Sequence, residues 1–181
     1  MKRPEETIVV VTGATGRLGQ RVVTELLSRG YQVRATDIKA ERRPPSATEA
    51  AVIGPVNVDY PVKVADMCDR AEADAILRGA DALVHMGAIP GPLSRGTTAY
   101  DDRGLFRNNV ESTMNLFLSA AEHKLRRVVF SSSAFVWFTY AGREDMSEKL
   151  PWHENTKADD WGKELRYLPI DENHPTRPTE T

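Results

Sequence analysis

The chain has 181 residues, of which 40% are hydrophobic and 28% charged, and its 24 basic and 26 acidic side chains give a formal net charge of -2. This length predicts one domain with a sizeable core. The even charge balance gives no sign of a nucleic-acid or membrane partner. The single cysteine, Cys68, excludes an intramolecular disulfide framework. No apolar run approaches the roughly 20 residues of a membrane span, and we expect a cytoplasmic protein.

Strand-like and helix-like patterns alternate along the first 138 residues. Apolar and β-branched runs predict strands at residues 7–12, 31–36, 62–65, 81–87 and 127–132. Apolar side chains at helical spacing predict helices at residues 17–29, 69–78 and 104–123, the last from Gly104 to His123. This order predicts an α/β fold with a Rossmann-type doubly wound parallel sheet. We expect about five strands in the order 3-2-1-4-5, incomplete at the carboxyl-terminal side.

The composition changes near Thr139. From there to Thr181 the chain is rich in charge and proline, and its apolar periodicity is poor. We therefore expect a single domain over residues 1–181, within which residues 139–181 form a polar excursion.

A glycine-rich segment stands directly between the first predicted strand and the first predicted helix, with the sequence TGATGRLG at residues 12–19. Gly13 would permit a tight exit from the strand, Gly16 would let a pyrophosphate approach the backbone, and Gly19 would let the helix pack closely. The amino end of a helix also offers free N–H groups to phosphates. The segment predicts nucleotide binding, although a tight structural turn is the alternative.

An acidic residue, Asp37, ends the second predicted strand, 18 positions after Gly19. A carboxylate there can accept hydrogen bonds from both hydroxyls of an adenosine ribose and would repel a 2′-phosphate, which favours NAD over NADP. Four nearby cationic side chains would weaken that repulsion: Arg34, Lys39, Arg42 and Arg43. A simple turn residue at the strand end is the alternative for Asp37.

Several segments together resemble the extended short-chain dehydrogenase/reductases, in the NAD-dependent epimerase/dehydratase family. They are TGATGRLG at 12–19, Asp37, Asp66-Met67, VHMGA at 84–88, NNVEST at 108–113, VVFSSSAFV at 128–136 and LPIDENHPTRP at 168–178. They span almost the whole chain in the order that the family has. The resemblance implies an oxidoreductase that acts on a sugar or sugar-derived hydroxyl by hydride transfer.

The resemblance also assigns roles to individual residues. It implies cofactor contacts for Gly13, Thr15, Gly16, Arg17, Leu18, Gly19, Asp37, Asp66, Met67, Met86, Gly87, Ala88, Ile89, Asn108, Ser131 and Ser132. Arg17 and Leu18 would border the pyrophosphate, and Asp66 and Met67 would lie at the adenine. Asn109 would brace the backbone. Ser133 matches the catalytic Ser/Thr that hydrogen-bonds the reacting oxygen, although a serine triplet at a strand end often only satisfies turn amides.

The family's Tyr-x-x-x-Lys pair, in which the tyrosine acts as acid and base, does not occur. Lysine is absent four positions after each of the five tyrosines, Tyr31, Tyr60, Tyr100, Tyr140 and Tyr167. In relatives the pair follows soon after the segment that resembles residues 168–178. We therefore expect the amino-terminal part of a longer enzyme, with residues 139–166 as an insertion. A non-catalytic NAD(P)-binding module or an inactive fragment is the alternative.

The remaining candidates give weaker signals. The four histidines, His85, His123, His153 and His174, share no metal-ligand spacing, so we expect no metal site. His85 lies within an apolar strand, and we expect a core histidine with satisfied hydrogen bonds. An incomplete sheet would expose an apolar edge, which with the helix from Gly104 to His123 favours association into a homodimer.

Overall fold

A computed structural model of the chain describes residues 2–44, 56, 58–89 and 102–133. The chain divides into two compact units, Met1–Ser131 and Ser132–Thr181. Every helix and strand that the structure describes lies in the first unit, preceded by a short 3-10 turn, η1 (Pro4–Glu6). The predicted excursion at residues 139–181, and the insertion within it, lie outside the described residues.

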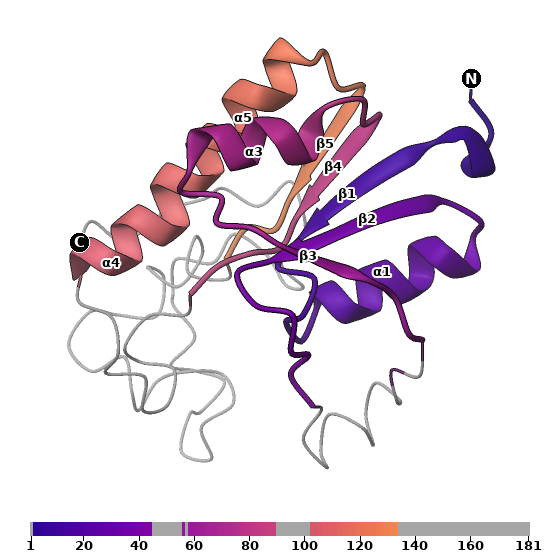
Figure 1. Cartoon of the computed structure of the whole chain (residues 1–181), viewed down its shortest axis with the longest axis horizontal. Coiled ribbons are helices and arrows are strands. Elements are labelled where there is room, and N and C mark those ends of the chain that lie inside the picture. Colours follow the sequence, from indigo (N-terminus) through magenta and orange to yellow (C-terminus); the bar gives the residue numbers. More distant parts are fainter. Residues whose placement is uncertain (1, 45–55, 57, 90–101, 134–181) are drawn as a thin grey trace, which may run out of the picture. The chain divides into compact units, whose positions relative to one another are not determined.

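Five parallel strands form one sheet in the order β3-β2-β1-β4-β5 (Figure 1). Their bounds are β1 Ile8–Thr12, β2 Gln32–Asp37, β3 Val62–Val64, β4 Ala82–His85 and β5 Arg127–Phe130. β1 lies at the centre, with Val10 opposite Arg34 of β2 on one side and Leu83 of β4 on the other. The predicted doubly wound order is confirmed.

Helices cover both faces of the sheet (Figure 1): α1 (Gly19–Ser28) on one face, and α3 (Arg70–Leu77) and α5 (Ser112–Glu122) on the other. Successive side chains of β1 pack into two separate hydrophobic cores, because neighbouring strand residues point to opposite faces of the sheet. Val9 and Val11 pack with Val23 of α1. Val10 packs on the other side with Leu77 of α3 and Leu116 of α5.

The helix ends follow local signals in the sequence. Asp69 caps α3, because its carboxylate accepts from the backbone N–H of Ala71 over 2.7 Å. Gly30 adopts a φ of +83° just after α1, the left-handed conformation in which a glycine commonly ends a helix.

The predicted helix at residues 104–123 is not one regular helix. It consists of α4 (Asp102–Phe106), a π-helical turn η2 (Arg107–Glu111) and α5. Within η2 the carbonyl of Arg107 accepts from the N–H of Ser112, five residues on. The extra residue in this turn changes the direction in which the following side chains point.

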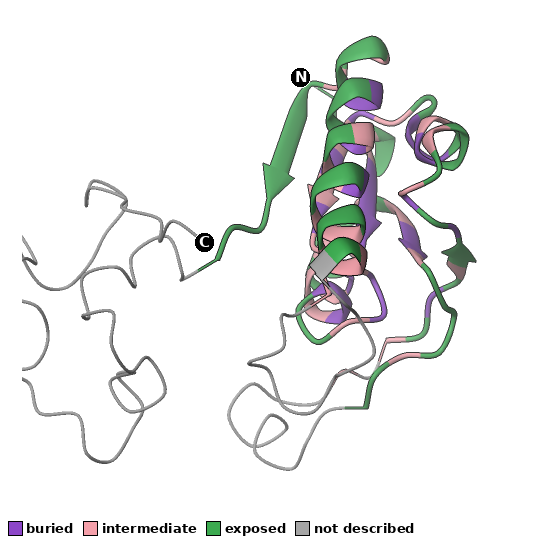
Figure 2. Cartoon of the chain, turned by 90° about the vertical axis from the view of Figure 1, so that its left-hand side faces the viewer, coloured by how far each residue is buried: buried purple, intermediate pink, exposed green. Residues whose placement is uncertain are grey.

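The first unit exposes apolar side chains on one helical segment and on the edge strand β5. The members are Phe106, Val110, Met114, Phe117 and Leu118 on α4, η2 and α5, and Val128, Val129 and Phe130 on β5. β5 is exposed along its whole length (Figure 2), and the rings of Phe117 and Phe130 meet edge to face at 5.7 Å. We call these eight residues the exposed apolar surface.

Candidate functional site

The glycine turn at residues 13–19 approaches the end of β4 without room for a side chain. Gly13 has a φ of +66°, and a Cβ added to it would lie 2.5 Å from the amide nitrogen of Gly87. A Cβ on Gly19 would overlap the carbonyl oxygen of Gly13. The tight exit predicted at Gly13 is therefore confirmed, and Gly19 allows the turn to fold back on itself as α1 begins.

The turn lies at the point where the strand order reverses. β1 pairs with β2 on one side and with β4 on the other, so the loops that follow β1 and β4 leave the sheet toward opposite faces. In open α/β sheets a ligand binds in the crevice at the carboxyl ends of such strands. Arg17 and Leu18 are exposed at the amino end of α1, where the helix dipole favours an anion.

The Asp37 carboxylate lies directly beside the glycine turn. One of its oxygens, Oδ2, accepts from the backbone N–H of Thr15 over 2.9 Å and from the Thr15 hydroxyl over 2.7 Å. The other, Oδ1, accepts from the N–H of Ile38 over 2.8 Å. Three donors therefore fix the orientation of the carboxylate, and Oδ1, which accepts from a single donor, keeps capacity for a further one.

Two residues that the sequence did not single out hold the glycine turn from outside. The Tyr60 hydroxyl donates to the carbonyl of Ala14 over 2.8 Å. The Gln20 side-chain amide donates to the carbonyls of Thr15, over 2.9 Å, and Arg43, over 2.7 Å. Burial raises the pKa of Tyr60, so its hydroxyl stays protonated as a donor. The contacts of Tyr60 with Ala14 and of Gln20 with Arg43 join segments 46 and 23 positions apart, so no local motif could have predicted them.

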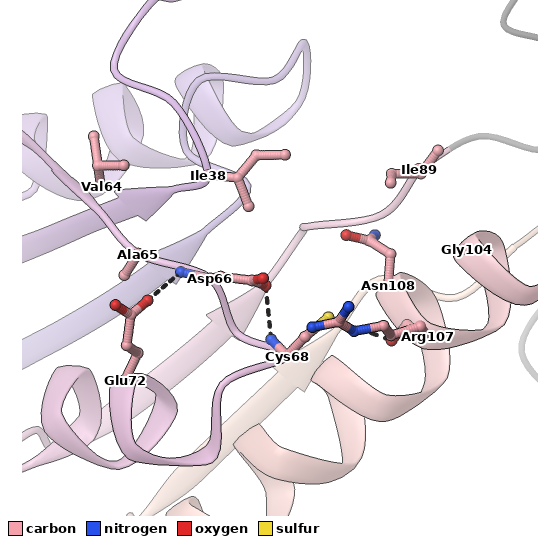
Figure 3. Close-up of a pocket in the computed structure, with 10 residues that line it drawn as sticks. All are labelled: Ile38, Val64, Ala65, Asp66, Cys68, Glu72, Ile89, Gly104, Arg107 and Asn108. Atoms are coloured by element: carbon pink, nitrogen blue, oxygen red, sulfur yellow. Dashed lines mark hydrogen bonds between the residues drawn. The ribbon is translucent and has the colours of Figure 1, made fainter. Parts of the chain in front are cut away.

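A pocket of about 530 Å³ lies beyond the carboxyl ends of β2 and β3 (Figure 3). Its lining residues are Ile38, Val64, Ala65, Asp66, Cys68, Glu72, Ile89, Gly104, Arg107 and Asn108. Ile38 and Val64 are exposed apolar side chains, while Asp66 and Asn108 supply polar groups. This volume falls in the range of roughly 300–1,000 Å³ that is typical of small-molecule sites.

The predicted pair Asp66 and Met67 divides between this pocket and the core. Asp66 is exposed in the pocket, and its Oδ1 accepts from the N–H of Cys68 over 2.9 Å. Met67 is 8% exposed and packs in the core with Ala73 and Leu116. The side chain of Met67 thus fills the space between the sheet and α5, and a contact of Met67 with the adenine stays a prediction.

Asn109 clamps the chain that follows β4. Its side-chain amide accepts from the N–H of Ile89 over 2.8 Å and donates to the carbonyl of Ile89 over 2.8 Å. Asn108 donates to the Asn109 side chain over 2.9 Å and lines the pocket. The expected backbone brace at Asn109 is confirmed, and it places Ile89 in the pocket wall.

The other predicted contact residues are spread over the end of the sheet. The N–H of Met86 donates to the carbonyl of Thr12 over 3.2 Å, which continues the ladder between β1 and β4, and Ala88 is exposed. The N–H of Ser131 donates to the carbonyl of His85 over 3.1 Å. Ser132 and Ser133 begin the second unit, so the geometry of the first unit does not include them.

Two titratable groups near the site are buried to different degrees. The Cys68 thiol is half-buried, and burial together with the nearby Asp66 carboxylate raises its pKa. The thiol therefore remains protonated near neutral pH and is a poor nucleophile. His85 is buried and bonded through both ring nitrogens, which confirms the prediction of a core histidine.

The fold and this site together define a class. A parallel sheet, a glycine turn at its switch point and an acidic residue that ends β2 beside that turn describe a dinucleotide-binding α/β protein of the Rossmann type. Residues 9–157 match the model of the NAD dependent epimerase/dehydratase family. The chain belongs to this family.

Individual relatives are similar over part of their length. Cinnamoyl-CoA reductase 1 of Oryza sativa subsp. japonica is 36% identical over 131 residues, 71% of this chain and 35% of that protein. UDP-glucose 4-epimerase of Caenorhabditis elegans is 28% identical over 137 residues, 71% of this chain and 38% of that protein. The chain thus spans less than half the length of these curated relatives.

Solved structures agree with this assignment. A short-chain dehydrogenase/reductase superfamily protein from Agrobacterium tumefaciens with bound NAD is 26% identical, with a TM-score of 0.61 over 96% of this chain and 40% of that chain. Uronate dehydrogenase from Agrobacterium tumefaciens is 26% identical, with a TM-score of 0.52 over 72% of this chain and 42% of that chain. Among the residues that the structure describes, no helix is both long and apolar enough to cross a membrane.

Proposed function

We propose that residues 8–131 form the NAD-binding part of an oxidoreductase that acts on a sugar or sugar-derived hydroxyl by hydride transfer. The observation that carries this proposal is the Asp37 carboxylate, which Thr15 fixes beside the glycine turn. A fixed carboxylate at that place suits the hydroxyls of an adenosine ribose and disfavours a 2′-phosphate. NAD is the cofactor in the family's name, and NADP is the less suitable ligand for this site.

The residues present fit a dinucleotide. A Cβ on Gly13 would close the approach between the ends of β1 and β4, and the amino end of α1 suits a pyrophosphate. The pocket with Ile38, Asp66 and Ile89 has apolar walls and a carboxylate for an adenine. Asn108 would border the same pocket, and Ser131 would lie nearer to the nicotinamide.

The chemistry divides between cofactor and protein. NAD supplies the hydride acceptor when it is bound. This chain's residues bind and orient it, and Ser133 would hold the substrate oxygen by a hydrogen bond, as the family resemblance implies. A tyrosine with a lysine four positions later does not occur in these 181 residues, so we assign the proton transfer to none of them.

A sugar substrate is supported by several relatives whose names include UDP-glucose 4-epimerase and uronate dehydrogenase. Other relatives are named for a cinnamoyl-CoA thioester and a sterol carboxylate. The alternative function is an NAD-binding module without catalysis. In either case the chain is expected to be cytoplasmic and to act on or with small molecules rather than nucleic acid.

Calorimetric titration of the chain with NAD and with NADP tests the binding proposal. We expect saturable NAD binding that is clearly tighter than NADP binding, and no heat from NAD would contradict the proposal. Formation of NADH with uronic acids or a sterol carboxylate, followed by its absorbance, and conversion of UDP-glucose to its 4-epimer, followed by chromatography, test the activity. Turnover of any of these substrates would exclude the non-catalytic module.

A further inference from the structure

His85, at the end of β4, joins three elements of the candidate site. It is 2% exposed, and its Nδ1 lies 2.6 Å from the hydroxyl of Thr12 at the end of β1. Its Nε2 lies 2.9 Å from the hydroxyl of Thr113 at the start of α5. The ring also stacks on Phe130 of β5, with 5.5 Å between centroids. A buried ring with these contacts has no freedom to turn.

The directions of these hydrogen bonds follow from Thr113. Its hydroxyl donates its only proton to the carbonyl of Asn109 over 2.6 Å, so toward His85 it can only accept. Nε2 of His85 must therefore carry a hydrogen. Burial lowers the pKa of His85 to about 4, so the ring is neutral near pH 7, and in a neutral ring with a protonated Nε2 the other nitrogen, Nδ1, accepts from the hydroxyl of Thr12. The contacts and the burial together define one tautomer.

The same chain of bonds continues to the pocket wall. Asn109 lies in the π-helical turn η2, where the hydroxyls of Ser112 and Thr113 bond the carbonyls of Asn108 and Asn109. These bonds occupy the carbonyls of Asn108 and Asn109. The side chain of Asn109 bonds both the N–H and the carbonyl of Ile89. Ile89 in turn lines the pocket.

The other end of the chain of bonds reaches the glycine turn. Thr12 directly precedes Gly13, and Gly13 lies against Gly87. The His85 ring lies beside this close approach, because its Cε1 would be 3.6 Å from a Cβ added to Gly87. One imidazole therefore links the glycine turn to the wall of the pocket.

We propose that His85 is a positioning residue for the dinucleotide site. Its fixed tautomer holds Thr113 and η2 in the geometry in which Asn109 clamps Ile89, while it holds the end of β1 through Thr12. This role rests on the proposed function, because NAD is the ligand for which the geometry is held.

Substitutions can separate the contact of His85 with Thr12 from its contact with Thr113. His85→Asn retains an acceptor near Nδ1 for Thr12 and loses the donor to Thr113, whereas His85→Gln retains a donor near Nε2. Thr113→Val removes the acceptor hydroxyl, and Thr113→Ser restores it. We expect His85→Asn and Thr113→Val to have similar effects that do not add in the double variant, and Thr113→Ser to behave as the wild type.

Three readouts on the full chain test the role. Nitrogen NMR of the His85 ring should show a protonated Nε2 and an unprotonated Nδ1. Amide exchange of Ile89 should be on the order of tenfold faster in His85→Asn and Thr113→Val, and NAD binding weaker by a similar factor. Ile76→Val, a core change in α3, is the control: it should lower the thermal midpoint and leave both Ile89 exchange and NAD affinity unchanged.

Each outcome decides the question. A protonated Nδ1, or unchanged Ile89 exchange in both variants, would overturn the proposal. Faster Ile89 exchange with unchanged NAD affinity would also overturn it, because the clamp would not matter to the ligand. If the wild type binds no NAD, the proposed function is wrong, and the tautomer and Ile89 exchange alone decide whether His85 positions the clamp.

Discussion

Thr15 donates both its backbone N–H and its hydroxyl to a single oxygen of the Asp37 carboxylate, over 2.9 and 2.7 Å. Hydrogen bonds to a charged group are stronger than those between neutral groups. The carboxylate is thus oriented before any ligand arrives, which lowers the entropic cost of using it to bind a ribose.

Asp37→Asn should weaken NAD binding on the order of tenfold and narrow the preference for NAD over NADP. The substitution removes the charge that repels a 2′-phosphate and places an amide against the donors of Thr15. Calorimetry with both cofactors measures the change. Glu41→Gln removes an exposed charge from the following segment and serves as the control. An unaltered NAD:NADP ratio in Asp37→Asn would show that Asp37 does not contact the ribose.

Gly13→Ala should destabilise the fold by about 3 kcal/mol, because it adds left-handed backbone strain and a methyl group against Gly87. Gly87→Ala is the matched control, since a Cβ there would be 3.4 Å from the nearest atom of Gly13, and should cost less than about 1 kcal/mol. Urea unfolding measures both. An equal loss of unfolding free energy in the two variants would contradict the view that only Gly13 lacks room for a side chain at this contact.

Stability should fall between neutral pH and pH 4 because of His85. Burial lowers the pKa of His85 to about 4, from 6.5 for an exposed histidine. As the pH falls, the unfolded state binds the His85 proton before the folded state does. The stability that the neutral ring contributes is therefore complete above pH 6.5 and is lost as the pH falls toward 4. The loss amounts to about 3 kcal/mol.

Urea unfolding across this pH range checks the prediction. In His85→Gln the dependence of the free energy of unfolding on pH should be flatter.

Two carboxylates, Asp74 and Asp81, affect stability in a lower pH range. Hydrogen bonds with Arg78 and His123 lower the pKa of Asp74, and Lys2 and Ile8 lower that of Asp81, so their contributions are lost only below about pH 4. A slope that persists in His85→Gln would assign the effect to another group.

The exposed apolar surface should drive self-association. Phe106 is 63% exposed and Met114 57% exposed, and β5 adds a strand edge beside them. Replacing both with serine should reduce concentration-dependent association, measured by light scattering or sedimentation, with little change in the thermal midpoint. A wild-type chain that stays monomeric at high concentration would refute the predicted homodimer contact.

Features that local sequence determines were predicted well. The apolar run of β1, the glycines that follow it and Asp37 at the end of β2 lie close together along the chain, and each has a conformational reason to occur there. The strand order also followed from the alternation of elements, because connections between parallel strands are right-handed.

Features that depend on distant contacts were not predicted. The regular spacing from Phe106 to Met114 predicts one helix, but the structure has a π turn there, in which Ser112 and Thr113 bond the carbonyls of the turn and Thr113 also contacts His85 of β4. Tyr60 reaches Ala14 across 46 positions, and nothing near either residue indicates it. Met67 follows the exposed Asp66, yet the side chain of Met67 points into the core beneath α5.

The three consecutive valines of β1 also have a consequence for how the strand keeps its register. Sliding β1 by two residues would bring Thr7, Ile8 and Val9, or Val11, Thr12 and Gly13, to the places where Val9, Val10 and Val11 now pack. Either shift puts a threonine hydroxyl into an apolar core and moves Gly13 away from Gly87. Polar contacts at the two ends of the strand add to this specification: Asp81 receives the N–H of Ile8, and His85 receives the hydroxyl of Thr12. Loss of both polar contacts should therefore weaken the alignment of β1 without changing its hydrophobic content.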